Sequence, residues 1–308
     1  MENIMKILNF GSLNLDYVYA VDHFVAEGET LASSVRNTFC GGKGLNQSVA
    51  LARAGVCTYH AGSVGPEGGM LTDMLQSAGV DVTYTRTVDT PTGHAIIQVD
   101  PRGRNCILLF GGANRCNDPA YVDAVLADFD AGDWLVLQNE ISSLPYLIER
   151  AKAKGMTVVL NPSPFDLSLV AAGLDQVDYV LLNETEGKQL TGYDAPANIL
   201  NAIRATYPSL KVVLTLGKDG CIYDDGAQRI AHGIYAVTAV DTTAAGDTFT
   251  GFFIGAISKG ATPADAIRRA SAASAIAVSR PGAAPSVPTA DEVDAFLTTN
   301  SPEATPEI

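Results

Sequence analysis

The chemistry that this sequence can support begins at Asp247, a carboxylate that follows three small residues, Ala244, Ala245 and Gly246. Small side chains let backbone N–H groups close around a ligand, and the free N–H groups at a helix N-terminus attract anions. A carboxylate would repel a bound phosphate, unless the same site deprotonates a hydroxyl beside a phosphoryl group that is transferred. The alternative interpretation is that Asp247 is an ordinary acid in the first turn of a helix, where it is stabilising.

Two predicted elements would position this carboxylate. Residues Ile234–Val240 are rich in β-branched and aromatic residues and predict a strand. Residues Thr248–Lys259 predict a mostly apolar helix, which ends at Gly260 with Pro263 just beyond. The small residues therefore lie at the turn that opens this helix.

A second glycine-rich turn, Cys40–Gly44, contains Lys43 and opens a predicted helix over Leu45–Ala54. The full P-loop pattern is absent, so that motif is not assigned. A lysine in a glycine-rich turn at the start of a helix is nevertheless a suitable place for an anion or a sugar hydroxyl. The alternative is a tight turn with a surface lysine.

Short apolar runs separated by helical segments predict a buried parallel sheet with helical crossovers. Polar or small residues end each run, and ligands bind outside the carboxyl ends of the strands in such sheets. One Asn at a strand end is also a good helix cap, but the series together predicts one active-site rim. The apolar runs are Trp134–Gln138, Thr157–Asn161, Tyr179–Asn183 and Val212–Leu216.

The composition is typical of a soluble globular protein: 308 residues, 47% hydrophobic and 18% charged. A net charge of −14 argues against non-specific binding to nucleic acid or to an anionic membrane. The five cysteines form no C-x-x-C pair and the four histidines no H-x-x-x-H pair, so we expect reduced thiols and no zinc site. Without an apolar run of about 18 residues or a signal peptide, we expect a cytoplasmic protein.

Three motifs, in this order, resemble those of the ribokinase-like carbohydrate kinases, the PfkB family: Gly41–Gln47, Asn183–Glu186 and Asp241–Phe249. The resemblance extends from Gly11 to Pro288, and the wording of the first motif is most similar to the ribokinase branch. It implies an α/β protein with a three-layer α/β/α fold, a mostly parallel central sheet and a small β-sheet lid. We expect one domain over residues 1–308, lid strands at about 14–39 and 94–110, and a disordered tail over 299–308.

The resemblance also implies transfer of a phosphoryl group from ATP to a primary hydroxyl of a sugar, with Asp247 as the general base. It implies that Ala244, Ala245 and Gly246 form an anion hole, and that Glu186 helps to place Mg²⁺ through water. The residues implied to hold sugar hydroxyls are Asn14, Asp16, Gly42, Lys43, Asn46, Glu140 and Asp247. Those implied to face the nucleotide are Asn183, Thr215, Gly217 and Gly246. An activating K⁺ is implied at Asp241, Thr243, Ala277, Arg280, Gly282 and Ser286.

We expect the sugar to be ribose, although Phe110 is expected near the sugar, where it would favour a narrower substrate such as deoxyribose. The alternatives are a kinase of the same fold for another sugar or a nucleoside, and a non-catalytic sugar or nucleotide sensor. A sensor would be expected to lack Asp247 or the small residues, and both are present. Exposed edges of the lid strands predict a homodimer that pairs two lids.

Overall fold

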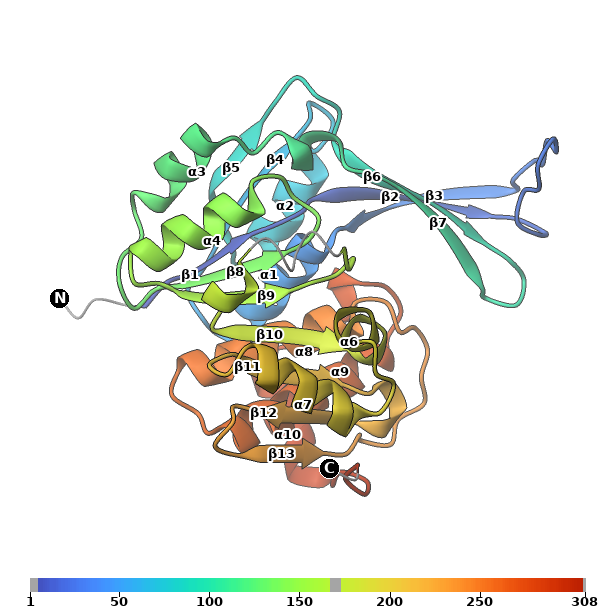
Figure 1. The fold of residues 1–308 in the computed structure, drawn as a ribbon. Helices are drawn as coiled ribbons and strands as arrows, with labels where there is room; N and C mark the ends of the chain where they lie inside the picture. Colours follow the sequence, from blue (N-terminus) through green and yellow to red (C-terminus); the bar gives the residue numbers. More distant parts are fainter. Residues whose placement is uncertain (1–4, 167–172, 307–308) are drawn as a thin grey trace.

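A large twisted sheet organises the chain, of which this computed structural model describes residues 5–166 and 173–306 (Figure 1). Nine strands of the described residues form it, in the order β13-β12-β11-β10-β9-β8-β1-β4-β5. Those from β11 to β5 are parallel, whereas β12 and β13 are antiparallel additions at one edge. The strands are β1 (Ile7–Phe10), β4 (Thr58–Val64), β5 (Asp81–Thr87), β8 (Trp134–Gln138), β9 (Thr157–Asn161), β10 (Tyr179–Asn183), β11 (Lys211–Thr215), β12 (Cys221–Asp224) and β13 (Arg229–His232).

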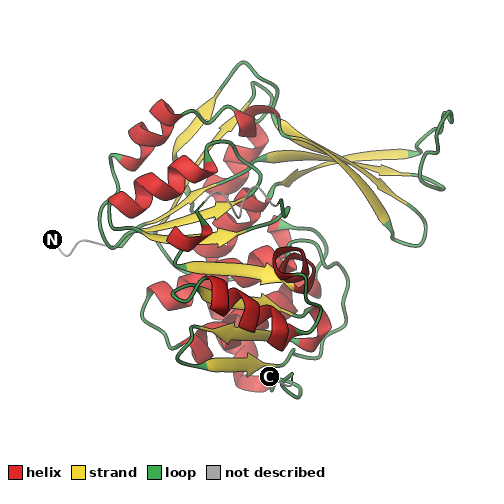
Figure 2. Cartoon of the chain, in the orientation of Figure 1, coloured by secondary structure: helices red, strands yellow, loops and turns green. Residues whose placement is uncertain are grey.

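Helices cover both faces of this sheet (Figure 2). Successive residues of a strand point to opposite faces, and here both faces are apolar: Ile7 packs in one core and Leu8 in the other. The first core includes α1 (Lys43–Arg53), α2 (Gly69–Ser77), α8 (Ala245–Ser258), α9 (Pro263–Val278) and α10 (Ala290–Thr299). The second includes α3 (Pro119–Leu126), α4 (Leu144–Ala153), α6 (Glu184–Thr191) and α7 (Pro196–Thr206). The predicted three-layer fold is confirmed.

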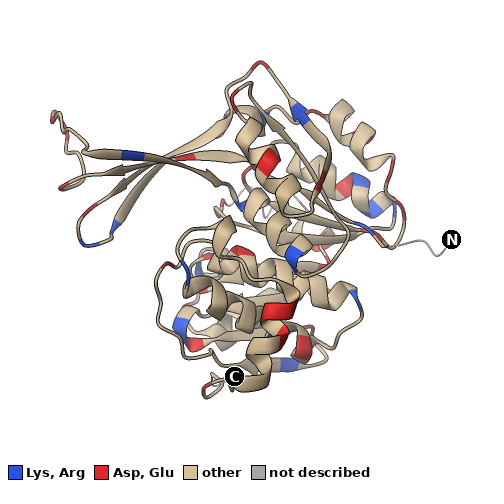
Figure 3. Ribbon diagram, turned by 180° about the vertical axis from the view of Figure 1, so that it is seen from behind, with Lys and Arg blue, Asp and Glu red and all other residues tan. Residues whose placement is uncertain are grey.

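A second, four-stranded sheet projects from this body as a long arm (Figure 1). We call it the lid; its strands, in the order β3-β2-β6-β7, are β3 (Val35–Gly41), β2 (Asn14–Ala20), β6 (Gly93–Val99) and β7 (Asn105–Phe110). Strands β2 and β6 are parallel, and each has one antiparallel partner. Lys, Arg, Asp and Glu are dispersed over the body and the lid on the side seen in Figure 3.

The predicted strand at Ile234–Val240 is wrong, because these residues have no neighbouring strand with which to pair. The N–H of Glu303 donates to the carbonyl of Ile234 at 2.7 Å, and the N–H groups of Val240 and Asp241 donate to the carbonyl of Val278. The segment is therefore held by the C-terminal residues and by the end of α9. Residues 307–308 of the predicted tail lie outside the described residues.

Helix α1 begins at Lys43, two residues before its predicted start, and α8 begins at Ala245, three residues before its predicted start. The runs predicted at β8, β9 and β10 have the bounds that the structure shows. Strands β4 and β5 and helix α3 were not predicted.

Candidate active site

The turn that opens α8 provides free backbone donors. Ala244 caps the helix in the left-handed conformation, with φ of 59°. The N–H of Ala245 donates to Thr242, whereas the next N–H groups of a first helical turn have no partner within the helix. A Cβ added at Gly246 would meet nothing within 4 Å, and Gly246 lines a cavity. These groups carry the positive end of a 14-residue helix dipole, which suits an anion.

Two amides of α1 hold the carboxylate of Asp247. Asn46 Nδ2 donates to Asp247 Oδ2 at 3.0 Å, and Gln47 Nε2 donates to Asp247 Oδ1 at 2.9 Å. All three side chains are buried. Each carboxylate oxygen thus has one fixed donor and keeps further acceptor capacity. Asp247 is more than a solvated first-turn acid, because its contacts connect two helices 200 residues apart in sequence.

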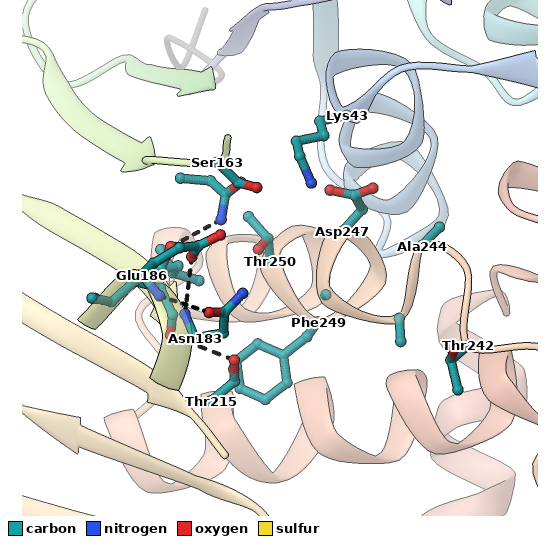
Figure 4. Close-up of a pocket in the computed structure, with 15 residues that line it drawn as sticks. Lys43, Ser163, Asn183, Glu186, Thr215, Thr242, Ala244, Asp247, Phe249 and Thr250 are labelled. Atoms are coloured by element: carbon teal, nitrogen blue, oxygen red, sulfur yellow. Dashed lines mark hydrogen bonds between the residues drawn. The ribbon is translucent and has the colours of Figure 1, made fainter. Parts of the chain in front are cut away.

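Lys43 lines a cavity of about 270 Å³ together with Asp247 and the first residues of α8. Figure 4 shows its ammonium and the Asp247 carboxylate pointing toward one another. Burial acts against the charged form of Lys43, but the charges of Asp247, Glu140 and Glu186 outweigh it and raise its pKa. The ammonium is therefore kept charged inside an acidic site, and the predicted surface-lysine alternative does not fit its position.

Two further acids lie on the other side of Lys43, toward the lid. Glu140 accepts hydrogen bonds from the Ser12 hydroxyl and from the N–H of Lys43, yet burial raises its pKa. Burial, with the nearby charge of Glu140, raises the pKa of Asp16 to about 7. In the described part of the chain, the Asp16 carboxylate accepts no hydrogen bond from a side chain. The Asp16 carboxylate lies against Gly41: a Cβ added to this glycine would be 2.0 Å from Asp16 Oδ2.

Three asparagines and one glycine near Asp16 and Lys43 also present polar groups, some with hydrogen-bond partners and one without. Asn114 Nδ2 donates to Asn14 Oδ1 at 2.7 Å, and Asn114 Oδ1 accepts from the N–H of Leu13. Asn46 Oδ1 is buried and has no hydrogen-bond partner among the described residues. Gly42 adopts a φ of 97°, which brings its backbone against Ser12. The Asp16 carboxylate and Asn46 Oδ1 thus remain as acceptors for a ligand that carries hydroxyl groups.

The register of the lid corrects the prediction for Phe110. Asp16 pairs with Ala95, which pairs with Leu109, so these three side chains share the face of the lid that bears the acceptors. Phe110 pairs with His94 on the opposite face, where the two rings are 4.9 Å apart. The residue of β7 that shares a face of the lid with Asp16 is therefore Leu109.

The far end of the cavity is built around the start of α6. Asn183 and Glu186 form a capping box, in which each side chain accepts from the backbone N–H of the other. Glu186 remains buried at the cavity wall, with one carboxylate oxygen outside this pair of bonds. Thr215 and the ring of Phe249 complete the wall (Figure 4). Leu181 and Leu182 add apolar surface, so this end of the cavity has both polar and apolar walls.

The residues predicted for a monovalent cation surround the loop before α8. Asp241 Oδ1 accepts from the N–H and the hydroxyl of Thr243, and Asp241 Oδ2 accepts from the N–H of Gly282 at 3.0 Å. Burial opposes its charge, but these bonds hold the pKa of Asp241 below its ordinary value. The Arg280 side chain pairs instead with Glu292 at 2.6 Å, so only its backbone can serve such a site. Within the described ranges, no three His, Cys, Asp or Glu side chains form a metal-binding group.

Comparisons with known proteins place this geometry in a family. The pfkB family of carbohydrate kinases matches residues 5–290. The chain belongs to that family. It is 37% identical over 298 residues to the ribokinase of Haemophilus influenzae, covering 93% of this chain and 96% of the relative. It is 31% identical over 309 residues to a deoxyribokinase of Salmonella typhi, covering 96% and 100%. The structure of Arabidopsis thaliana ribokinase complexed with ribose and ATP has a TM-score of 0.85 to it at 30% identity, covering 96% and 99%.

This carbohydrate kinase brings most of its predicted site residues to one region, in two groups. Lys43, Asn183, Glu186, Thr215, Ala244, Ala245, Gly246 and Asp247 line the same cavity. Asn14, Asp16, Gly42, Asn46, Glu140 and Gly217 are not among the residues that line it, but Asn46 and Glu140 are hydrogen-bonded, respectively, to Asp247 and to the N–H of Lys43, which are. The predicted cation residues Ala277, Gly282 and Ser286 lie behind the loop of Asp241, where Arg280 N donates to Ala277 O and Ser286 N donates to Ala283 O.

Sequence reasoning missed three contributors to the kinase site. Ser12 orients Glu140, Asn114 orients Asn14, and Gln47 holds Asp247. Gln47 is the last residue of the motif Gly41–Gln47, but nothing in the motif indicates that it contacts Asp247. Asn114 lies in the turn that follows β7. Its contact with Asn14, which is 100 residues away in the sequence, depends on the path of the chain after the hairpin of β6 and β7.

Proposed function

We propose that this kinase transfers the γ-phosphoryl group of ATP to the 5-hydroxyl of D-ribose and produces D-ribose 5-phosphate. The observation that carries this proposal is the doubly hydrogen-bonded Asp247 carboxylate beside the open N–H groups at the start of α8. A base and an anion site so close together suit a hydroxyl that attacks a phosphorus atom. The names of the relatives support ribose in particular.

Each step of the proposed phosphoryl transfer has a candidate residue. Asp247 accepts the proton of the attacking hydroxyl, while Asn46 and Gln47 keep its carboxylate in place. Asp16, Glu140 and the free Oδ1 of Asn46 accept from the other sugar hydroxyls. A loose phosphoryl-transfer transition state requires mainly positioning and charge neutralisation. The helix N-terminus and Lys43 provide these for the transferred group.

Two ions complete the proposal, and the residues fit both. Mg²⁺ bound to ATP would neutralise phosphate charge, and Glu186 has a carboxylate oxygen at the cavity wall to hold it through water. K⁺ would lie beside Asp241 and the carbonyl groups of the loop that contains Gly282. That loop is already joined to the start of α8 through Asp241, so a bound ion would help to order the anion hole.

2-Deoxyribose is the second candidate substrate, because a deoxyribokinase is among the relatives. It lacks one hydroxyl donor, and the unpaired acceptors Asp16 and Asn46 favour the substrate with the additional donor. A nucleoside fits less well, because buried acceptors rather than apolar walls surround the sugar end. The test is ATP turnover with a panel of pentoses, hexoses and nucleosides, in the presence of Mg²⁺, with and without K⁺. Ribose-dependent, K⁺-stimulated turnover is expected; turnover only with another sugar would reject ribose.

We further propose that the kinase is a homodimer joined through its lids. Strand β7 is a lid edge whose side chains are all exposed, including those of Ile107, Leu108 and Phe110. Leu108 is 67% exposed, and a second lid would bury such side chains and pair the free edge. Sedimentation should show a dimer for the wild type and a monomer for Leu108→Glu. A wild-type monomer at micromolar concentration would contradict the proposal.

A cytoplasmic location is proposed on the state of the thiols. All five cysteines are free, which suits a reducing compartment. No helix among residues 5–166 and 173–306 is long and apolar enough to cross a membrane.

A further inference from the structure

A continuous line of buried amide side chains leads from Asp247 into the protein. Gln47 Nε2 donates to Asp247 Oδ1, and Gln47 Oε1 accepts from Gln138 Nε2 at 2.8 Å. The same Nε2 of Gln138 donates to Asn9 Oδ1 at 2.9 Å. Gln47, Gln138 and Asn9 are all completely buried between α1 and the strands β8 and β1.

The line continues to a histidine on β4. Asn9 Nδ2 donates to the Ser48 hydroxyl and to the carbonyl of Gly44, both at 2.9 Å. Ser48 Oγ lies 2.8 Å from His60 Nδ1. Burial lowers the pKa of His60 to about 3, so its ring is neutral and Nδ1 can accept the hydroxyl proton. Every hydrogen bond from Asp247 to Ser48 therefore has a defined donor.

The carboxylate at one end sets this direction, because it can only accept. Gln47 must present its Nε2 to Asp247, so its Oε1 faces Gln138, and Gln138 must present Nε2 in turn. Gln138 Oε1 consequently has no partner among the described residues. An unpaired oxygen in a fully buried side chain is unfavourable. Gln138 Nε2 donates to Gln47 Oε1, and this hydrogen bond holds the Gln47 amide in one of its two orientations.

We propose that Gln47, held in one orientation by Gln138 and Asn9, is a positioning residue that keeps the Asp247 carboxylate aimed at the sugar hydroxyl. The proposal rests on the proposed function, in which Asp247 is the base. The charged groups that face Asp247 are Lys43 from α1 and Glu140 after β8, and Glu186 acts through Lys43. None of them belongs to the amide line, so a change at Gln138 leaves them in place.

The decisive variant is Gln138→Glu, which nearly preserves the shape of the side chain but replaces its donor with acceptors. Gln47 would then turn its Nε2 toward residue 138 and present Oε1 to Asp247. Repulsion between these oxygens would turn the Asp247 carboxylate away from its wild-type position. Misplacement of the base should lower kcat about 10- to 100-fold, with the KM for ATP unchanged. Gln138→Leu, which only removes the donor, should have a smaller effect in the same direction.

Val136→Ala is the matched control, because Val136 is equally buried on the same face of β8 but lies outside the amide line. It should lower the melting temperature and leave kcat unchanged. If Gln138→Glu folds and retains the wild-type kcat, the proposal is overturned. A kcat that falls equally in Val136→Ala would also overturn it, since loss of packing would then be sufficient.

A measurement without turnover separates this inference from the proposed function. In ¹⁵N-glutamine-labelled free enzyme, the Nε2 resonances of Gln47, assigned with Gln47→Leu, report its hydrogen bond to Asp247. They should be displaced from their wild-type positions in Gln138→Glu, because Nε2 then no longer faces Asp247. This result supports the orientation even if Gln138→Glu is inactive, and Gln138→Leu provides the comparison if Gln138→Glu does not fold. Gln47 resonances at their wild-type positions in Gln138→Glu would overturn the orientation. A wild type that phosphorylates no sugar would instead reject the proposed function.

Discussion

Gly251 of α8 lies so close to Ala50 of α1 that a Cβ added to the glycine would be 2.3 Å from the Cβ of the alanine. One turn further along, a Cβ at Gly255 would be 2.8 Å from that of Ala54. One turn earlier in each helix, the pair is Asp247 and Asn46, which are joined by a hydrogen bond. The close approach of the two helices therefore sets the distance between the carboxylate and its donors.

Gly251→Ala should separate these helices at the turn next to the base. Overpacking of this kind costs about 1–3 kcal/mol of stability, and kcat should fall because the bonds from Asn46 and Gln47 lengthen. Thermal unfolding and steady-state kinetics measure the two effects. Gly69→Ala is the control, since a Cβ there meets nothing within 4 Å and its φ is not positive. A Gly251→Ala enzyme with wild-type kcat would show that helix spacing does not control the base.

Asp247→Asn should remove nearly all turnover while ATP still binds with nearly unchanged affinity. The amide cannot accept the proton, and loss of a general base costs about 10²- to 10⁴-fold. Calorimetry with ATP and single-turnover assays measure the two properties. The control is Asp265→Asn, because Asp265 is also an acid in the first turn of a helix but lies on α9, outside the cavity. Retention of one tenth of wild-type activity in Asp247→Asn would reject the base assignment.

The sequence was sufficient where local pattern and burial coincide. Strands β8, β9 and β10 are central in the sheet and buried on both faces, so their apolar runs end where the strands end. Residues Ile234–Val240 show the limit of such patterns: β-branched residues favour a strand only when a neighbouring strand is there to pair. The start of α8 was misplaced because Ala244 adopts a left-handed conformation, which a residue other than glycine seldom does.

Within the site, the sequence indicated the residues and their chemistry but not their partners. The contact between Gln47 and Asp247 depends on how α1 and α8 pack, and no local pattern describes that packing. Phe110 was misplaced for a related reason. The parallel pairing of β2 with β6 decides which face of β7 is presented to Asp16, and a shift of one residue would reverse it.

Ribose binding should strengthen as pH rises through about 7, where Asp16 ionises. The pKa of this carboxyl is 3.8 in the unfolded chain and about 7 in the folded protein. Between these values only the unfolded chain has lost the proton, so the free energy of unfolding falls as pH rises toward 7. Hydroxyl donors of the sugar favour the ionised form, so binding releases a proton below that pH and becomes independent of pH above it. Calorimetric titration in buffers of different ionisation enthalpy measures both quantities.

Asp16→Asn is the control for this pH dependence. It should flatten the profile and weaken ribose binding by about 1.5–3 kcal/mol, the range for a hydrogen bond to a charged group. A wild-type affinity that is constant on both sides of pH 7 would mean that Asp16 does not titrate in the free enzyme or does not contact the sugar.

Leu109 and Phe110 should separate sugar recognition from the outer face of the lid. Leu109 shares the face of Asp16, so Leu109→Ala should raise the KM for ribose several-fold and relax discrimination among pentoses, with the KM for ATP unchanged. Phe110 is 47% exposed on the other face, beside His94 and Tyr17. Phe110→Ala should leave the KM for ribose unchanged and weaken association of the lids in sedimentation. The two variants differ by one position on one strand, so the reverse result, a KM effect from Phe110 alone, would mean that the register of β7 is shifted by one residue.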